Sequence, residues 1–175
     1  WNGEYMAFTN DFTDAPDVVG HEYTHGVTEL SADLIYEAES GALNESYSDV
    51  FGNMIDRTNW LIGDGVPDGP IRSMSDPSSI SLPIVQDPFP PTYPDTYEGP
   101  NWMPTDTTCE GGNDSCGVHI NSSVPNKAAY LLASTGLHIH NGNPVYGSDR
   151  EKTEQIYYET LTSYLTSSAT MLQMA

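Results

Sequence analysis

Residues 18–29 read VVGHEYTHGVTE, and this stretch decides both the expected fold and the expected chemistry. Pro16 stands just ahead of it, where proline suits the first turn of a helix, with Asp14 nearby as a candidate cap. We therefore expect a helix from about Pro16 to residue 31. Positions four apart share one helical face, with Cβ atoms about 5–6 Å apart, so His21 and His25 point the same way.

The pattern formed by His21, Glu22 and His25 is HExxH. Two imidazoles on one helical face can bind one zinc ion, and a glutamate beside the first can face a zinc-bound water. The alternative is an ordinary helix with two surface histidines, because these few letters recur by chance. The stretch alone leaves both interpretations open.

A catalytic zinc needs a third protein ligand, and the next predicted helix, from about Ser40 to Arg57, offers one. Glu45 follows His25 after a loop and a return helix, and its spacing favours it over Glu39. Asp49 lies one turn beyond Glu45 and could accept the ring N–H of a ligating histidine. The alternative is an amphipathic helix with acids on its wet face. Its apolar residues recur at steps of three and four: Leu43, Tyr47, Val50, Phe51, Met54 and Ile55.

The rest of the chain predicts a mainly α protein with long loops. EYMAFTN (residues 4–10) indicates a short strand and turn, which we interpret as an N-terminal β-hairpin. Residues 58–118 are rich in proline, including the run PFPPTYP, and are expected to be loops. Two more helices fit 122–135, ended by Gly136, and 148–165, capped by Ser148 or Asp149. We expect residues 1–175 to form a single domain.

The composition is strongly acidic, with 25 acidic residues against 5 basic ones and a net charge of −20. Such a surface repels nucleic acid and anionic membranes, and we expect neither as a partner. No apolar run approaches the roughly 20 residues that a membrane span needs. The plainest interpretation is a solvated acidic surface, although some acids could hold cations.

The two cysteines, Cys109 and Cys116, lie in TTCEGGNDSCG. The Gly-, Asn- and Asp-rich segment between them can bend enough to close a disulfide, which would indicate an oxidising, extracellular compartment. A zinc site here is disfavoured because no second cysteine pair or paired histidine accompanies them.

Four segments resemble, in order and spacing, the thermolysin family of secreted zinc endopeptidases: HEYTHGVTE, LIYEAESGALNESYSD, IRSMSDP and GVHINSSVPNKAAYLL. The resemblance runs from Trp1 to the C-terminus, with extra loop between about residues 78 and 113. It implies the helical half of an α+β metallopeptidase that is secreted and acts on peptide or protein substrates. By the family pattern, we expect two parts of the protease to be absent from this chain: an N-terminal β-rich domain and the extreme C-terminus. The β-rich domain would be a partner of this chain, because in the family it forms the other wall of the cleft.

The resemblance implies roles for the residues already singled out. His21, His25 and Glu45 match the zinc ligands. Glu22 matches the general base that takes a proton from the zinc-bound water and later delivers it to the leaving amine. Asp49 matches the carboxylate that orients His21.

The resemblance also implies roles that spacing alone does not suggest. Tyr36 and His119 match the pair that stabilises the oxyanion, and Asp114 matches the carboxylate that holds His119. Arg72 matches the arginine that positions the substrate backbone and steadies the site. Taken without the family, His119 would be a structural histidine before a helix, and Arg72 would form a simple surface ion pair.

Specificity and calcium follow from the same resemblance. Val18 and Ile71 match positions that line the family's S1′ pocket, which implies a preference for bulky apolar residues at P1′. The alternative is that both are ordinary core residues, and the two interpretations are compatible.

One structural calcium site is expected near the end of the second helix. Asp17 and Asp56 match liganding positions, and Asn53, Asn59 and the Leu61 backbone could join them, because oxygen ligands suit Ca²⁺. The alternative is scattered surface acid.

Two rival functions remain beside a zinc endopeptidase. One is a zinc- and calcium-binding fragment of such a protease that lacks its substrate-binding half and has no turnover. The other is a different HExxH hydrolase acting on a non-peptide substrate. The pair of His119 and Asp114 weighs against the latter, because a generic zinc hydrolase need not carry it.

Overall fold

The computed structural model describes residues 3–8, 12–82, 88–137 and 142–175. Its helices are α1 (Pro16–Glu29), α2 (Ala38–Ile55), α3 (Asp114–Asn121), α4 (Ser123–Ala133), α5 (Arg150–Ser163) and α6 (Met171–Met174). Two short antiparallel pairs of strands join β1 (Leu61–Ile62) to β2 (Arg72–Ser73), and β3 (Gly136–Leu137) to β4 (Pro144–Val145). Single 3₁₀ turns lie at Pro77–Ser79 and Gly111–Asn113. The predicted mainly helical fold with long loops is confirmed.

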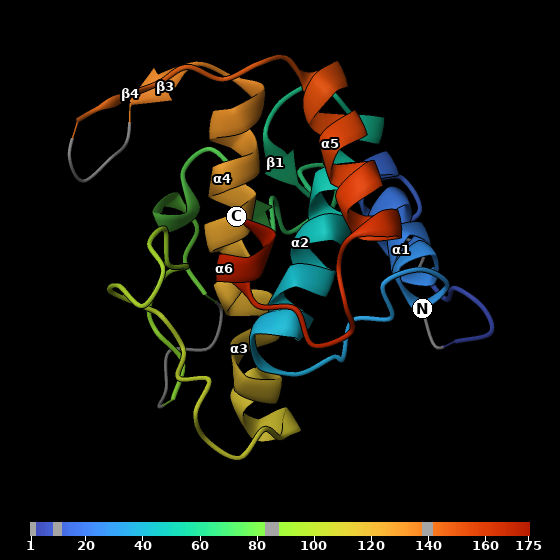
Figure 1. Cartoon of the computed structure of the whole chain (residues 1–175), viewed down its shortest axis with the longest axis vertical. Coiled ribbons are helices and arrows are strands. Elements are labelled where there is room, and N and C mark those ends of the chain that lie inside the picture. Colours follow the sequence, from blue (N-terminus) through green and yellow to red (C-terminus); the bar gives the residue numbers. More distant parts are fainter. Residues whose placement is uncertain (1–2, 9–11, 83–87, 138–141) are drawn as a thin grey trace.

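Helix α2 is the centre of the molecule (Figure 1). It packs against α1, α3, α4, α5 and α6. Its buried residues include apolar ones, such as Leu43, Tyr47 and Val50, but also an unusual set of polar ones: Asn44, Glu45, Ser46, Ser48, Asp49 and Asn53. Buried polar groups destabilise a fold unless they find hydrogen-bond partners. Several of these residues find their partners at the candidate metal centre described below.

Helices α1 and α2 touch backbone to backbone at two glycines. A Cβ placed on Gly20 of α1 would lie 3.2 Å from the Cα of Gly52 in α2. A Cβ on Gly52 would collide with the main-chain carbonyl oxygen of Asp17. Glycine in a helix interior costs about 1 kcal/mol relative to alanine. Without side chains at these two positions, the helices can approach closely, which places the face that carries His21 and His25 against the middle of α2.

Most helix boundaries agree with the sequence, and three local features differ. The N-cap of α1 is Ala15, with no side-chain cap, so the expected cap at Asp14 is wrong; Pro16 does occupy the first turn. The described part of the expected N-terminal strand, residues 4–8, has no strand, and residues 9 and 10 lie outside the described residues. Helix α3 falls where loop was expected, because it is short and has no long apolar repeat to signal it. Asp149 caps α5 as predicted, accepting the main-chain N–H of Lys152 at 2.8 Å.

The main hydrophobic core forms between α2 and the C-terminal helices. The rings of Tyr47 in α2 and Tyr157 in α5 lie 5.2 Å apart, and both residues are almost fully buried. The predicted disulfide between Cys109 and Cys116 is confirmed and joins the loop before α3 to its first turn. Within the described residues, no helix combines the length and the apolarity that a membrane-spanning segment requires.

Replacing Gly52 with alanine should separate α1 from α2. Overpacking of this kind costs about 1–3 kcal/mol, and we expect Gly52→Ala to lower the free energy of unfolding by that amount in urea titrations. Gly112→Ala is the matched control, because nothing lies within 4 Å of a Cβ built there. Equal stability of the two variants would contradict the backbone contact.

Candidate metal centre

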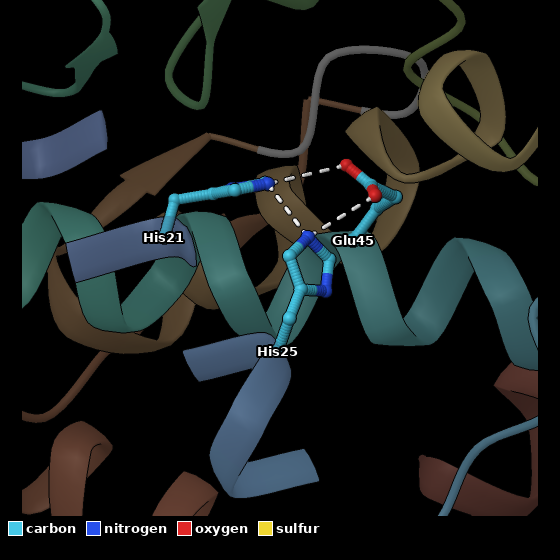
Figure 2. A group of neighbouring side chains, drawn as sticks. All are labelled: His21, His25 and Glu45. Atoms are coloured by element: carbon cyan, nitrogen blue, oxygen red, sulfur yellow. Dashed lines mark hydrogen bonds and ion pairs between the residues drawn. The ribbon is translucent and has the colours of Figure 1, made fainter. Parts of the chain in front are cut away.

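Three side chains from α1 and α2 converge on one point (Figure 2). The Nε2 atoms of His21 and His25 lie 3.0 Å apart. The His21 Nε2 is 3.5 Å from Oε2 of Glu45, and the His25 Nε2 is 3.4 Å from Oε1. The helical period predicted that the histidines share a face, and the α1–α2 contact brings Glu45 to them.

The other ring nitrogen of each histidine has its own partner. The Nδ1 of His21 donates to Oδ1 of Asp49 at 2.8 Å, and the Nδ1 of His25 donates to Oδ1 of Asn44 at 2.7 Å. Burial lowers the pKa of His25, which favours its neutral form. With Nδ1 carrying the hydrogen, the neutral His25 ring presents Nε2 as an acceptor.

The converging atoms therefore form a cluster of acceptors that suits a cation. The Oε2 of Glu45 is buried and has no hydrogen-bond partner. Zinc binds histidine nitrogen at about 2.0–2.1 Å in a tetrahedron, which separates neighbouring ligand atoms by roughly 3.3 Å. The two Nε2 atoms lie 3.0 Å apart, and each lies close to a different oxygen of Glu45, Oε2 for His21 at 3.5 Å and Oε1 for His25 at 3.4 Å. His21, His25 and Glu45 are the one such group of His, Cys, Asp or Glu among the described residues, and their donor set fits zinc.

Asp49 lies behind these ligands and accepts hydrogen bonds from three residues. Besides His21, it accepts two hydrogen bonds from Arg72, at 2.6 Å from Nε and 2.7 Å from Nη2, and one from Asn126 Nδ2 at 2.7 Å. Asp49 and Arg72 are both buried, so Arg72 does not form the surface ion pair considered from sequence. Burial would raise the pKa of Asp49, but Arg72 and His21 hold it well below its usual range. Arg72 thus fixes the carboxylate that orients His21.

Glu45 is ionised for a similar reason. Burial alone would raise its pKa, but the charges of His21, His119 and Arg72 lower it to about 2. The nearest guanidinium nitrogen, Nη2 of Arg72, is 3.8 Å from Oε2 of Glu45. A carboxylate that stays charged in a buried setting is a ready ligand for a cation.

Tyr36 and His119 lie on the open side of the cluster. The hydroxyl of Tyr36 donates to Glu45 Oε1 and lies 3.1 Å from Nε2 of His119. His119 is held by Asp114, whose Oδ1 binds its Nδ1 at 2.5 Å and whose Oδ2 accepts its main-chain N–H at 2.8 Å. Burial would lower the pKa of His119, but Asp114 and Glu45 raise it above its ordinary value. Burial and the neighbouring Glu45 carboxylate raise the pKa of Tyr36, which keeps its proton.

Two pockets open beside the cluster, and His21, Glu22, Glu45 and His119 line both. One pocket, of about 480 Å³, is mostly polar. The other, of about 350 Å³, has a wall of apolar side chains: Ala7, Phe8, Phe12, Val18, Ile62 and Ile71. The structure therefore brings the two predicted specificity residues, Val18 and Ile71, beside the metal ligands, while both also pack in a small core cluster.

The residues predicted to bind calcium are only partly brought together. Asn53 donates from Nδ2 to the carbonyls of Asn59 at 3.0 Å and Leu61 at 3.4 Å, and its buried Oδ1 has no hydrogen-bond partner. Asp17 accepts the main-chain N–H groups of Val18 and Gly63, and Asp56 accepts the main-chain N–H and the hydroxyl of Thr58. Burial, followed by the charges of Asp64 and Asp56, raises the pKa of Asp17 against the effect of its hydrogen bonds.

Sequence reasoning missed three residues that hold the ligands from behind. Asn44 binds His25, and Ser48 also approaches its Nδ1 at 3.2 Å. The i, i+4 spacing of Asn44 and Ser48 is the signal that could have shown that both face α1. Asn126, which accepts from Ser46 at 2.8 Å while donating to Asp49, is a buried polar residue of α4.

Comparison with known proteins identifies the relatives of this chain. The family profile described as thermolysin metallopeptidase, alpha-helical domain, matches residues 32–175. Neutral protease B of Bacillus subtilis (strain 168) is 41% identical over 186 residues, covering 99% of this chain and 31% of its own length. Bacillolysin of Brevibacillus brevis is 43% identical over 173 residues, covering 95% of this chain and 30% of its own length. The similarity to neutral protease B therefore extends ahead of residue 32, across His21 and His25.

A solved structure agrees with these sequences. The precursor of protealysin, a metalloproteinase from Serratia proteamaculans, matches with a TM-score of 0.66 and 35% identity, covering 99% of this chain and 55% of that one. The chain spans only about a third of the curated relatives it matches. With the profile covering most of its residues, this chain belongs to the thermolysin metallopeptidase family and corresponds to the alpha-helical domain of that family.

Proposed function

We propose that residues 1–175 form the metal-binding catalytic domain of a zinc-dependent endopeptidase that acts on peptide or protein substrates. The observation that carries the proposal is the convergence of three acceptor atoms, from His21, His25 and Glu45, beside Glu22 at the rim of two pockets. A zinc ion held by these three residues would polarise a peptide carbonyl and lower the pKa of a water molecule.

The remaining residues supply proton transfer and charge stabilisation. Glu22 takes the proton from the attacking water on its carboxylate and later gives it to the leaving amine. The Tyr36 hydroxyl and the His119 Nε2–H donate to the oxyanion that forms at the attacked carbonyl, and each such donor is worth about 3–4 kcal/mol. Asp114 keeps His119 in this orientation by accepting from Nδ1.

The apolar pocket supports a preference for bulky apolar residues at P1′. Val18 and Ile71 line it together with Glu22, so a side chain that follows the cut bond would bury its surface there. Burying a leucine-sized side chain is worth about 1.5–3 kcal/mol, which is enough to bias cleavage.

A second candidate is a chain that binds zinc and calcium without cleaving peptides. This chain spans 31% of the length of neutral protease B, so cleavage by residues 1–175 has to be measured rather than carried over from that relative. Stoichiometric zinc binding with no cleavage of any peptide would select this function.

We also propose secretion, supported by the disulfide, since disulfides persist in oxidising compartments. Recovery of the native protein from the cytosol with free thiols at Cys109 and Cys116 would contradict it.

Glu22→Gln should abolish peptide cleavage while leaving zinc bound. Removing the general base costs about 10²–10⁴-fold in kcat, measured on casein and on a furylacryloyl dipeptide pair with leucine or alanine at P1′. We expect the leucine substrate to be cut faster, and a zinc chelator to stop both reactions.

Glu159→Gln is the control for the loss of one negative charge, because Glu159 is exposed on α5 far along the chain from the site. Cleavage that survives both chelation and Glu22→Gln would rule out the mechanism. Equal rates for leucine and alanine would rule out the P1′ preference alone.

Asn44→Ala should weaken zinc binding without removing a ligand. Loss of the hydrogen bond that fixes the His25 ring should reduce zinc affinity about 10–100-fold, measured by competition with a fluorescent chelator. Glu45→Ala, which removes a ligand itself, should lose zinc altogether. Wild-type affinity in the Glu45 variant would sink the ligand assignment.

We propose one structural calcium site formed by Asp17 and Asp56 with Asn53, Asn59 and the Leu61 carbonyl. Calcium at one hundred times its dissociation constant should stabilise the fold by about 2.7 kcal/mol, seen as a rise in the thermal midpoint. Asp56→Asn should remove the rise, and Asp106→Asn, on an exposed loop, should not. No calcium-dependent rise in the wild type would exclude the site.

A further inference from the structure

The segment that begins α3 has an unusual backbone. Asp114, Ser115, Cys116 and Gly117 are four consecutive residues with positive φ, at 55°, 49°, 67° and 79°. Only glycine adopts this region freely, and each other residue there costs on the order of 1 kcal/mol or more. Such a run persists only where its surroundings hold it in place.

Its C-terminal end is held by packing. A Cβ on Gly117 would collide with the side chain of Met103. Asn121 fixes Met103 in turn, because its side-chain amide exchanges two hydrogen bonds with the Met103 main chain, each 2.9 Å long. These contacts do not involve the cysteines.

Its N-terminal end is held by the disulfide and one asparagine. Cys116 is fully buried, and its bond to Cys109 closes the loop in front of the left-handed run. Inside that loop, Oδ1 of Asn113 accepts the N–H groups of Cys116 at 3.1 Å and Glu110 at 3.0 Å, and its Nδ2 donates to the carbonyl of Thr108 at 2.9 Å. Cys109 is partly exposed, so a reductant can reach the bond.

The left-handed conformation of residues 114–117 determines where the side chain of Asp114 lies. Its carboxylate turns back over the first turn of regular helix and accepts from the main-chain N–H of His119 at 2.8 Å, the N–H of Ile120 at 3.3 Å and the ring Nδ1 of His119 at 2.5 Å. The conformation that brings Asp114 to His119 is therefore the one that the disulfide locks.

We propose that the Cys109–Cys116 disulfide is a redox-sensitive positioning element for His119, an inference that rests on the proposed function for its kinetic part. A dithiol supplies two electrons and two protons: the S–S bond breaks to two thiols, and the dithiol closes to its own disulfide. The left-handed run then relaxes, Asp114 leaves His119, and the oxyanion donor loses its fixed direction while the three zinc ligands stay in place.

Amide hydrogen exchange tests the structural part without any need for activity. Reduction with a water-soluble phosphine, which takes up the oxygen of water as the two thiols form, should speed exchange in residues 114–121 by about tenfold or more. Exchange in α1 and α2 should stay unchanged and shows that the chain remains folded. Unchanged exchange at 114–121 in the reduced protein would overturn the proposal.

Kinetics tests whether the disulfide acts through Asp114. Reduction should lower kcat by about 10–100-fold, the scale expected for a misplaced catalytic group, with KM changed less than about twofold and zinc content unchanged. In an Asp114→Ala background, reduction should have no further effect on kcat. An equal fall in both backgrounds would show a general structural role and refute the proposal.

The pair Cys109→Ser with Cys116→Ser is the matched control. It should behave as the reduced protein with or without phosphine, which separates loss of the bond from zinc removal by the reagent. Wild-type kcat in this variant would also refute the proposal. If the oxidised protein cuts no peptide at all, the proposed function fails, and the exchange measurement still decides the structural claim.

Discussion

The carboxylate of Asp49 is the point on which the rest of this structure depends. It joins four separate segments, because it accepts from His21 in α1, Arg72 in β2 and Asn126 in α4 while it belongs to α2. A buried charge is tolerated only when it is paired and hydrogen-bonded, and breaking one such pair costs about 3–5 kcal/mol. The ion pair thus serves folding and also orients His21, a proposed metal ligand.

The same requirement, that buried polar groups find partners, shapes the candidate metal centre. Helix α2 turns polar residues toward α1, where an apolar helix would have packed more simply. The Nε2 atoms of His21 and His25 converge there with Oε2 of Glu45, which has no hydrogen-bond partner. A cation bound there would satisfy this buried carboxylate oxygen, so metal binding at the proposed site would be thermodynamically coupled to folding.

The sequence predicted those features that repeat with the helical period. His21 and His25, and then Glu45 and Asp49, are each four apart, and that spacing alone places each pair on one face. The disulfide was predictable because two cysteines stand close together in a flexible segment. The family resemblance, confirmed by the profile match, added Tyr36 and His119, whose approach to Glu45 depends on tertiary structure.

Other features lay outside what a single sequence carries. Asn44 and Asn126 hold the ligands through contacts across helices. Spacing could place Asn44 on the face toward α1 but could not identify its partner, and nothing local marks Asn126. The left-handed run at 114–117 was missed because three of its four residues, Asp114, Ser115 and Cys116, are not glycine. Long-range contacts overrode local backbone preference there. The predicted cap at Asp14 was wrong for a related reason, because capping depends on the direction in which the chain enters the helix.

The contact between Gly20 and Gly52 has a consequence for how accurately this centre is built. A helix interface lined by side chains can shift by tenths of an ångström as rotamers change, whereas two backbones in contact have no rotamers to change. Main-chain contact therefore helps to set the spacing between the histidines of α1 and the glutamate of α2. A substitution elsewhere in the core can therefore change the stability of the fold while the distances between His21, His25 and Glu45 are preserved.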